Sequence, residues 1–158
     1  MTNSFDDVDF KALVSAPEST QQSVLAQVNE MLGELSPKAR VQWALAHLPG
    51  SHGLSSSFGI QSAVMLHLLT KEQHDIPVIL TDTGHLFPET YQFIDKLTQR
   101  LSLNVKVYQS DLSPAWQQAR FGKEWEQGHD GLDAHNKRNK VEPMQRALQE
   151  LGIGTWFS

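Results

Sequence analysis

Two short polar segments contain the residues best suited to bind an anionic ligand. The first, Ser55 to Gly59, reads SSSFG and combines three hydroxyl groups with a glycine. Backbone N–H groups at the start of a helix bind anions without a formal charge, and serine hydroxyls add further donors. Glycine lets the chain approach a ligand closely. We therefore expect a phosphate cradle at Ser55, Ser56, Ser57 and Gly59, with helix capping by serine as the simpler alternative.

The second segment, Asp82, Thr83 and Gly84, follows the apolar run IPVIL. A carboxylate at the end of a buried strand can accept hydrogen bonds from a nucleobase amine or from ribose hydroxyls. The alternative is an Asx-type turn that precedes a helix starting at Pro88. Two polar loops at the ends of neighbouring strands favour a nucleotide site over coincidence.

Several other kinds of site are excluded by spacing or composition. SSSFG is followed by neither Gly-Lys-Ser nor Gly-Lys-Thr, and it is not a Gly-x-Gly-x-x-Gly fingerprint. The seven histidines show no His-x-x-x-His or His-Glu-x-x-His spacing, so no metal site is expected. The chain has no cysteine, which excludes disulfides, thiolate metal sites and cysteine nucleophiles within it.

The overall charge and hydropathy point to a protein that binds neither nucleic acid nor membranes. Lysine and arginine number 13 against 18 acidic residues, a net charge of -5, whereas polyanion-binding surfaces need an excess of basic residues. The segment MTNSFDDVDF lacks the basic flank and apolar core of a signal peptide. No window approaches the ~18 apolar residues of a membrane span. We expect a cytoplasmic protein.

The two polar segments must be positioned by an α/β domain. Residues 1–49 are predicted to form a helical arm, with a helix that Ser36 caps and Pro37 opens. Residues 50–158 alternate strands and helices, and parallel strands need such long crossovers. The prediction is a parallel, doubly wound sheet with flanking helices. Its strands are predicted at 53–57, 76–82, 103–109 and 152–158, with helices at 60–71, 88–101 and within 111–151.

Four segments together resemble the phosphoadenosine phosphosulfate (PAPS) reductase family, over about residues 35–158. The resemblance implies an adenine nucleotide alpha-hydrolase-like (PP-loop) fold. It also implies an oxidoreductase of sulfate assimilation and cysteine biosynthesis, which uses thioredoxin to reduce 3'-phosphoadenylyl sulfate to sulfite and adenosine 3',5'-bisphosphate. The segments are SSSFGIQ, LTDTGHLFPETY, FGKEWEQG, and KVEPMQRALQEL closing on TWFS.

The resemblance also assigns roles to residues and partners. Ser55, Ser56, Ser57, Phe58 and Gly59 would hold the phosphosulfate. Asp82, Thr83 and Gly84 would border the nucleoside, and Lys140 would face the sulfate end. The neighbouring Lys137 and Arg138 are more simply a solvated basic stretch. The expected partners are thioredoxin or glutaredoxin and a second copy of the chain, as a homodimer.

The sequence departs from related families at three places. Gly59 stands where ATP-cleaving relatives have an aspartate, which suits an already activated sulfonucleotide. His135 and Asn136 stand where iron–sulfur adenylylsulfate reductases have paired cysteines, so no iron–sulfur cluster or other cofactor is expected. The family's nucleophilic cysteine, in a Glu-Cys-Gly-Leu-His motif, and an arginine-rich segment would follow Ser158.

We therefore expect these 158 residues to hold the nucleotide-binding part, truncated on its C-terminal side, and to be inactive alone. Two alternatives stay open. One is a PP-loop ATP pyrophosphatase or adenylyltransferase, and the other is a non-catalytic adenylate-binding module.

Overall fold

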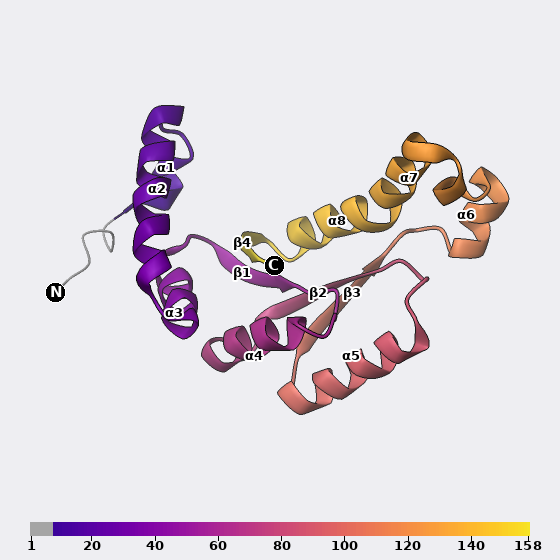
Figure 1. Cartoon of the computed structure of the whole chain (residues 1–158), viewed down its shortest axis with the longest axis horizontal. Coiled ribbons are helices and arrows are strands. Elements are labelled where there is room, and N and C mark those ends of the chain that lie inside the picture. The colour runs from indigo at the N-terminus through magenta and orange to yellow at the C-terminus, as the bar shows by residue number, and fades with distance from the viewer. Residues whose placement is uncertain (1–7) are drawn as a thin grey trace. The chain divides into compact units, whose positions relative to one another are not determined.

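The computed structural model describes residues 8–158 (Figure 1). The chain divides into two compact units between Gly50 and Ser51. The described part of the first unit has three helices: α1 (Phe10–Leu13), α2 (Glu18–Glu34) and α3 (Pro37–His47).

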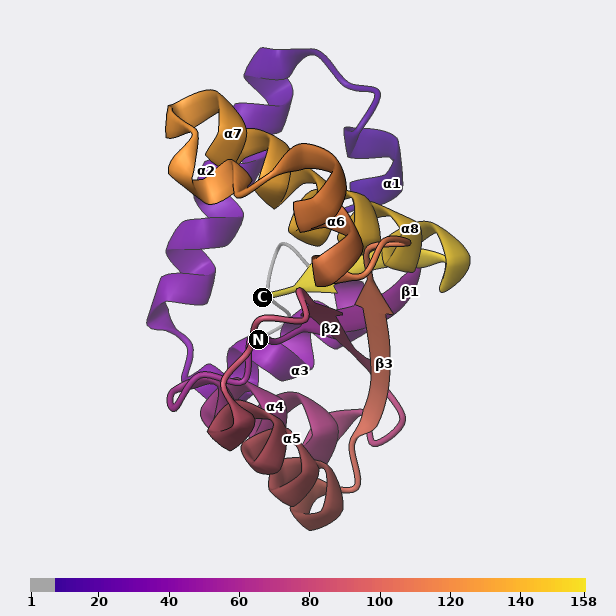
Figure 2. The same ribbon diagram turned by 90° about the vertical axis from the view of Figure 1, so that its right-hand side faces the viewer.

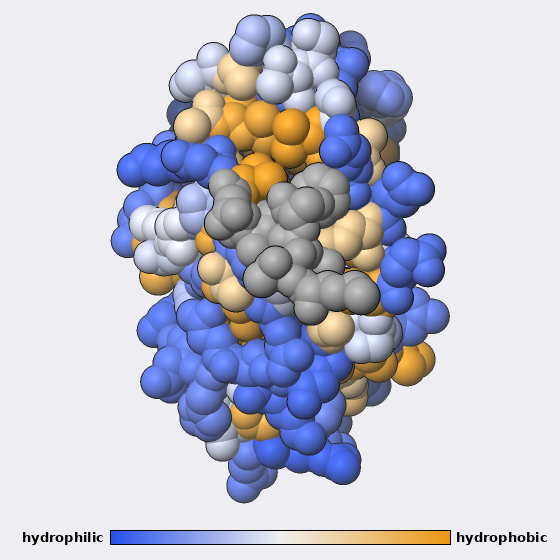
Figure 3. Space-filling model, turned by 90° about the vertical axis from the view of Figure 1, so that its left-hand side faces the viewer, coloured by the Kyte–Doolittle hydropathy of each residue, from blue (hydrophilic) through white to orange (hydrophobic). Residues whose placement is uncertain are grey.

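Two of the three helices described in the first unit, α1 and α3, start at side-chain caps. Asp9 Oδ1 accepts hydrogen bonds from the backbone amides of the first turn of α1. Ser36 Oγ accepts from the amide of Ala39 at 3.3 Å, and Pro37 opens α3 as predicted. Trp43 packs edge-on against Phe10, with ring centroids 5.8 Å apart. Figure 3 shows that hydrophilic residues predominate on the face it presents, with apolar residues gathered in smaller areas.

The second unit is built on a parallel sheet of four strands in the order β3-β2-β1-β4. The parallel sheet and its fourth strand confirm the predicted fold class. The strands are β1 (Ser51–Ser55), β2 (Pro77–Asp82), β3 (Asn104–Gln109) and β4 (Ile153–Phe157).

Helices lie on both faces of this sheet, as Figures 1 and 2 show. One face is covered by α4 (Ser62–Glu72) and α5 (Pro88–Leu101), which contact each other. The segment from β3 to β4 crosses the other face and places α8 against β2, β3 and β4. It comprises α6 (Pro114–Phe121), the 3-10 turn η1 (Glu124–Glu126), α7 (Gly128–Asn136), the π-helical turn η2 (Lys137–Val141) and α8 (Glu142–Glu150).

The core lies around the two central strands. Val78 and Ile79 of β2 are both fully buried, because helices cover the sheet on its two faces. This explains why the run IPVIL is continuously apolar and does not alternate. Side chains from both helical layers complete the core: Leu66, Leu69, Ile94, Leu97 and Ala147.

Candidate functional site

The serine loop leaves the sheet at its topological switch point. The chain steps from β1 to β2 to β3 in one direction, and then returns past β1 to place β4 on the far side. Ligands of open parallel sheets bind outside the carboxyl ends of the strands at such a point. Ser55 ends β1 here, and the preceding residue Leu54 is in register with Phe157 near the end of β4.

A cavity of about 300 Å³ lies beside the serine loop. All three serines of SSSFG contribute to its wall, so the predicted phosphate-binding residues do line a hollow. Its other walls come from the end of β1, the start of α4 and the end of β4. The lining residues are Leu54, Ser55, Ser56, Ser57, Ser62, Met65, Leu66 and Ser158.

Some of the groups predicted to bind phosphate already form hydrogen bonds within the protein. The amide of Ser56 donates to the carbonyl of Ile79 on β2 at 3.0 Å, and the amide of Phe58 donates to Ser56 Oγ at 3.0 Å. Ser55 Oγ accepts from the indole N–H of Trp156 at 2.9 Å. By contrast, the amides of Ser57 and Gly59 make no hydrogen bond within residues 8–158, and both residues are exposed. These two amides are therefore available as donors to an anion.

Phe58 carries the unusual backbone conformation in the loop. It has φ of 52° and a side chain that is 2% exposed, so the ring anchors the loop in the core. Phe58 could therefore touch a ligand only through its backbone. A Cβ added at Gly59 would meet only Ser57 Oγ, at 3.8 Å. Nothing in the described fold requires a glycine there, so close approach of a ligand to Gly59 stays a prediction.

Helix α4 begins later than the sequence predicted. It starts at Ser62 and not at Ile60, because the amide and hydroxyl of Ser62 both donate to the carbonyl of Gly59. No side chain caps this helix. Capping by the three loop serines, the alternative explanation of SSSFG, is therefore absent, and the sole serine at the helix start is Ser62.

The second predicted loop forms an Asx turn. Asp82 Oδ1 accepts hydrogen bonds from the amide of Gly84 and from the hydroxyl of Tyr91, both at 2.8 Å. Helix α5 then starts at Pro88, as the Asx-turn interpretation of this segment predicted. Since both bonds reach Oδ1, Asp82 Oδ2 has no hydrogen-bond partner among the residues the structure describes. The turn and a ligand contact are therefore compatible.

Asp82, Thr83 and Gly84 line a second cavity of about 270 Å³. Its described lining includes two carboxylates but no lysine or arginine, so it suits hydroxyl or amine donors better than phosphate. No residue lines both this cavity and the one beside the serine loop. The other lining residues are Gln109, Ser110, Asp111, Leu112, Ser113, Pro114 and Asn139.

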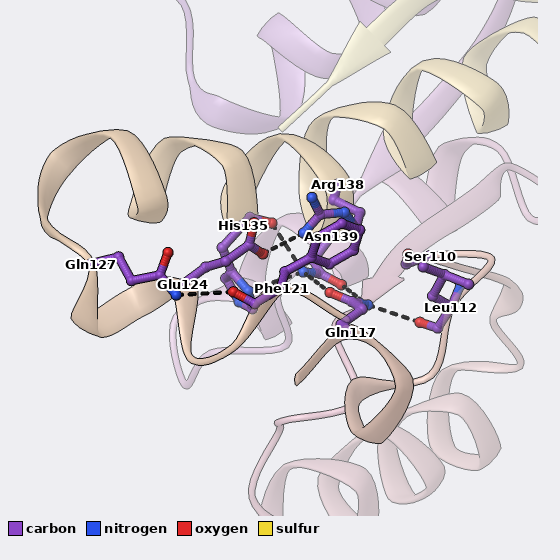
Figure 4. A network of polar contacts seen from close by, with 9 residues as sticks. All are labelled: Ser110, Leu112, Gln117, Phe121, Glu124, Gln127, His135, Arg138 and Asn139. Carbon is purple, nitrogen blue, oxygen red and sulfur yellow. Dashed lines mark hydrogen bonds and ion pairs between the residues drawn. The ribbon is translucent and has the colours of Figure 1, made fainter. Parts of the chain in front are cut away.

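Sequence reasoning missed Asn139, which lines this cavity, and Gln117, which exchanges side-chain amide hydrogen bonds with Asn139 (Figure 4). Gln117 also donates to the carbonyl of Leu112 at 2.8 Å, which fixes the loop that follows β3. Asn139 lies in η2, in the middle of a continuous helical run from α7 to α8. Pro143 lacks the N–H that would bond the carbonyl of residue 139, and this accounts for a π-helical turn there. The signal for this turn in the sequence was an Asn four residues before a proline within a helical pattern.

The predicted cationic residues around η2 differ in environment. Lys140 is exposed, adjoins the lining residue Asn139 in sequence and lines neither cavity. Lys137 is also exposed, as a solvated basic stretch would be. Arg138 is only 22% exposed, because it pairs with the buried carboxylate of Glu124 and its guanidinium lies 4.0 Å from the ring centroid of Phe121. Arg138 is therefore a structural residue.

The second unit, which carries both loops, matches a known protein family in sequence. The sequence model of the phosphoadenosine phosphosulfate reductase domain matches residues 51–158, the whole of the second unit. The chain belongs to the phosphoadenosine phosphosulfate reductase domain family. Both loops and the η2 turn fall within the matched residues.

Individual members of the PAPS reductase family are similar over most of this chain. Phosphoadenosine 5'-phosphosulfate reductase of Shewanella oneidensis is 64% identical over 150 residues, which cover 95% of this chain and 61% of the relative. The Vibrio vulnificus protein of the same name is 62% identical, over 92% of this chain and 57% of the relative. This chain thus spans about three fifths of the length of these curated relatives.

A solved PAPS reductase shares the fold. The crystal structure of phosphoadenylyl-sulfate reductase from Candida auris, a phosphate complex, matches with a TM-score of 0.73 and 28% sequence identity. The match covers 85% of this chain and 66% of the other. Between residues 8 and 158, no helix of this family member has the length and apolar character needed to cross a bilayer. The same residues bring no three His, Asp or Glu side chains together as a metal site.

Proposed function

We propose that this chain is the nucleotide-binding part of a thioredoxin-dependent reductase of 3'-phosphoadenylyl sulfate. The observation that carries the proposal is the pair of unbonded amides of Ser57 and Gly59, two exposed residues at the switch point of the sheet. The similarity to enzymes named phosphoadenosine 5'-phosphosulfate reductase supports the choice of substrate.

In this proposal the two loops divide the substrate between them. The amides of Ser57 and Gly59, with the Ser57 hydroxyl, donate to the phosphosulfate oxygens. Local donors are needed because the net charge of -5 repels an anion. Asp82 Oδ2 accepts from the nucleoside. Lys140, whose side chain is exposed and long, neutralises the sulfate end as charge develops on the leaving phosphate.

The reduction itself needs a thiol from outside these residues. A cysteine thiolate attacks the sulfur, the bond between sulfur and the phosphate oxygen breaks, and adenosine 3',5'-bisphosphate leaves. A thioredoxin or glutaredoxin dithiol then releases sulfite and is oxidised to its disulfide. This chain has no cysteine, so it should not turn over alone. A homodimer without any cofactor, acting in sulfate assimilation in the cytoplasm, remains the prediction for the complete enzyme.

Calorimetry with adenosine 3',5'-bisphosphate and with AMP tests the substrate class. We expect the bisphosphate to bind at least about tenfold more tightly, a difference of ~1.4 kcal/mol. Ser57→Trp should abolish binding, because the indole fills the space in front of the amides. Ser19→Trp, on the exposed surface of α2, is the control and should bind normally. Equal affinity for both nucleotides, or unchanged binding by Ser57→Trp, would overturn the proposal.

A further inference from the structure

Three aromatic rings from separate elements meet beside the Asp82 loop. His85 lies in the loop after β2, Trp125 in η1 and His135 in α7. The ring centroids are 5.6 Å apart for His85 and Trp125, and 5.4 Å for Trp125 and His135. Those of the two histidines are 6.0 Å apart. We call these three residues the ring cluster. It is accessible to protons, since His85 is exposed and Trp125 is 41% exposed.

The ring cluster links two segments that line the 270 Å³ cavity. On one side, His85 follows Gly84, and its amide donates to Thr83 Oγ1 at 3.3 Å. On the other side, the carbonyl of His135 accepts from Asn139 Nδ2 at 3.0 Å, and His135 Nδ1 lies 3.2 Å from the same nitrogen. Figure 4 shows His135 and Asn139 side by side. Thr83, Gly84 and Asn139 all line the cavity.

We propose that the ring cluster positions the Asp82–Gly84 loop against the helical segment while its imidazoles are neutral, and that protonation of both imidazoles releases the loop. Released, the loop would hold the nucleoside more weakly; this ligand effect rests on the proposed function. The cluster is a positioning device, because nothing places its rings on the reacting atoms.

The charges around the cluster explain why two protons are poorly tolerated. One imidazolium can be accommodated beside the Trp125 ring, because the cluster is partly exposed to solvent. A second imidazolium would face the first, with Arg138 and Lys140 adding like charge and Glu124 opposing them. Glu124 is already paired with Arg138, so it offers limited compensation.

Burial and the neighbouring charges also determine the direction in which the pKa of His135 is shifted. Burial, and after it the charge of His85, hold this pKa below its ordinary value of 6.5. As the pH falls, a released or unfolded His135 therefore takes up a proton at a higher pH than His135 in the docked cluster does. The stability of the docked cluster is complete above pH 6.5 and decreases as the pH falls below that value.

The first test needs no ligand. Proton NMR of the imidazole Cε1–H groups should give His135 a pKa below 6.5, and His85→Gln should raise it by removing the facing charge. His129→Gln is the control, because His129 lies on the same helix but is exposed and pairs with Asp133. An unchanged His135 pKa in His85→Gln would contradict the coupling within the cluster.

The second test measures affinity for adenosine 3',5'-bisphosphate at pH 7.5 and pH 5.5. His85→Phe keeps a ring in the cluster but removes one imidazole. The affinity that this variant loses between pH 7.5 and pH 5.5 therefore measures the effect of protonating the ligand itself. Between pH 7.5 and pH 5.5, the affinity of the unsubstituted chain should fall about fivefold more than that of His85→Phe. A factor of five is at the low end of typical coupling between two sites. Equal losses in both proteins would overturn the inference. If neither protein binds at either pH, the proposed function fails, and the NMR titration still decides the cluster.

Discussion

Asn139 and Gln117 exchange two amide hydrogen bonds, of 2.8 and 2.9 Å, between the π-helical turn η2 and helix α6. Both side chains are buried, at 1% and 6% exposure. Each amide therefore satisfies the other where water cannot reach, and the pair fixes Asn139 in the wall of the cavity that Asp82 also lines. Such reciprocal pairs are sensitive to the loss of one partner, because the oxygen of the remaining amide is left buried without a donor.

Asn139→Leu should destabilise the chain by ~1–3 kcal/mol, the cost of an unsatisfied buried group. The double variant Asn139→Leu with Gln117→Leu should recover part of this loss, since no amide is then stranded. Urea unfolding of both single variants and the double variant gives the coupling energy. Strictly additive losses would show that the pair does not act as a unit.

The glycines of the two loops should respond differently to alanine. Gly84→Ala should cost on the order of 1–3 kcal/mol, because φ is 72° there and a Cβ would lie 2.6 Å from Pro114 Cγ. Gly59→Ala should change stability by less than about 0.5 kcal/mol, as nothing in the fold opposes it.

The same Gly59→Ala variant should bind adenosine 3',5'-bisphosphate about tenfold more weakly, ~1.4 kcal/mol, because the methyl group stands where the ligand approaches. Thermal unfolding and calorimetry on one preparation separate the two effects. A stable Gly59→Ala variant with full affinity would remove the steric argument for this glycine.

The two tyrosines offer a pH test of the Asp82 turn. The hydrogen bond to Asp82, followed by burial, raises the pKa of Tyr91 above 10.0. A raised acid pKa means that the folded chain keeps the proton longer than the unfolded one. The stabilisation is thus complete below pH 10 and is lost as the pH rises through the folded pKa.

Ultraviolet titration should show the pKa of Tyr91 falling toward 10.0 in Asp82→Asn. Tyr108, whose pKa is raised first by burial and then by Glu150, is the internal reference. Two unaltered phenol titrations in Asp82→Asn would show that the turn bond does not persist in solution.

Local sequence signals predicted much of the fold. The cap at Ser36, the start of a helix at Pro88 and the apolar run of β2 each depend on a few neighbouring residues, and all three are confirmed. The strand predicted at residues 103–109 is confirmed as β3, but the exposure of its side chains was not predicted. Val107 is 56% exposed because β3 is the edge strand, and edge position depends on strand order.

The details of the site were harder to predict. A glycine signals backbone freedom in a sequence, yet the residue with φ of 52° in the serine loop is Phe58, held there by burial of its ring. The Asn139–Gln117 pair joins residues 22 positions apart through a π-helical turn, which periodicity does not reveal. The ring cluster likewise depends on contacts among three elements.

Nitrogen-15 NMR of the chain titrated with adenosine 3',5'-bisphosphate tests the central claim most directly. The account predicts that the backbone amides of Ser57 and Gly59 shift strongly, and that the Asp82–Gly84 amides follow with the same binding curve. The internally bonded amide of Ser56 should shift less. A titration that leaves the Ser57 and Gly59 amides unmoved, or that saturates while only other regions shift, would contradict it.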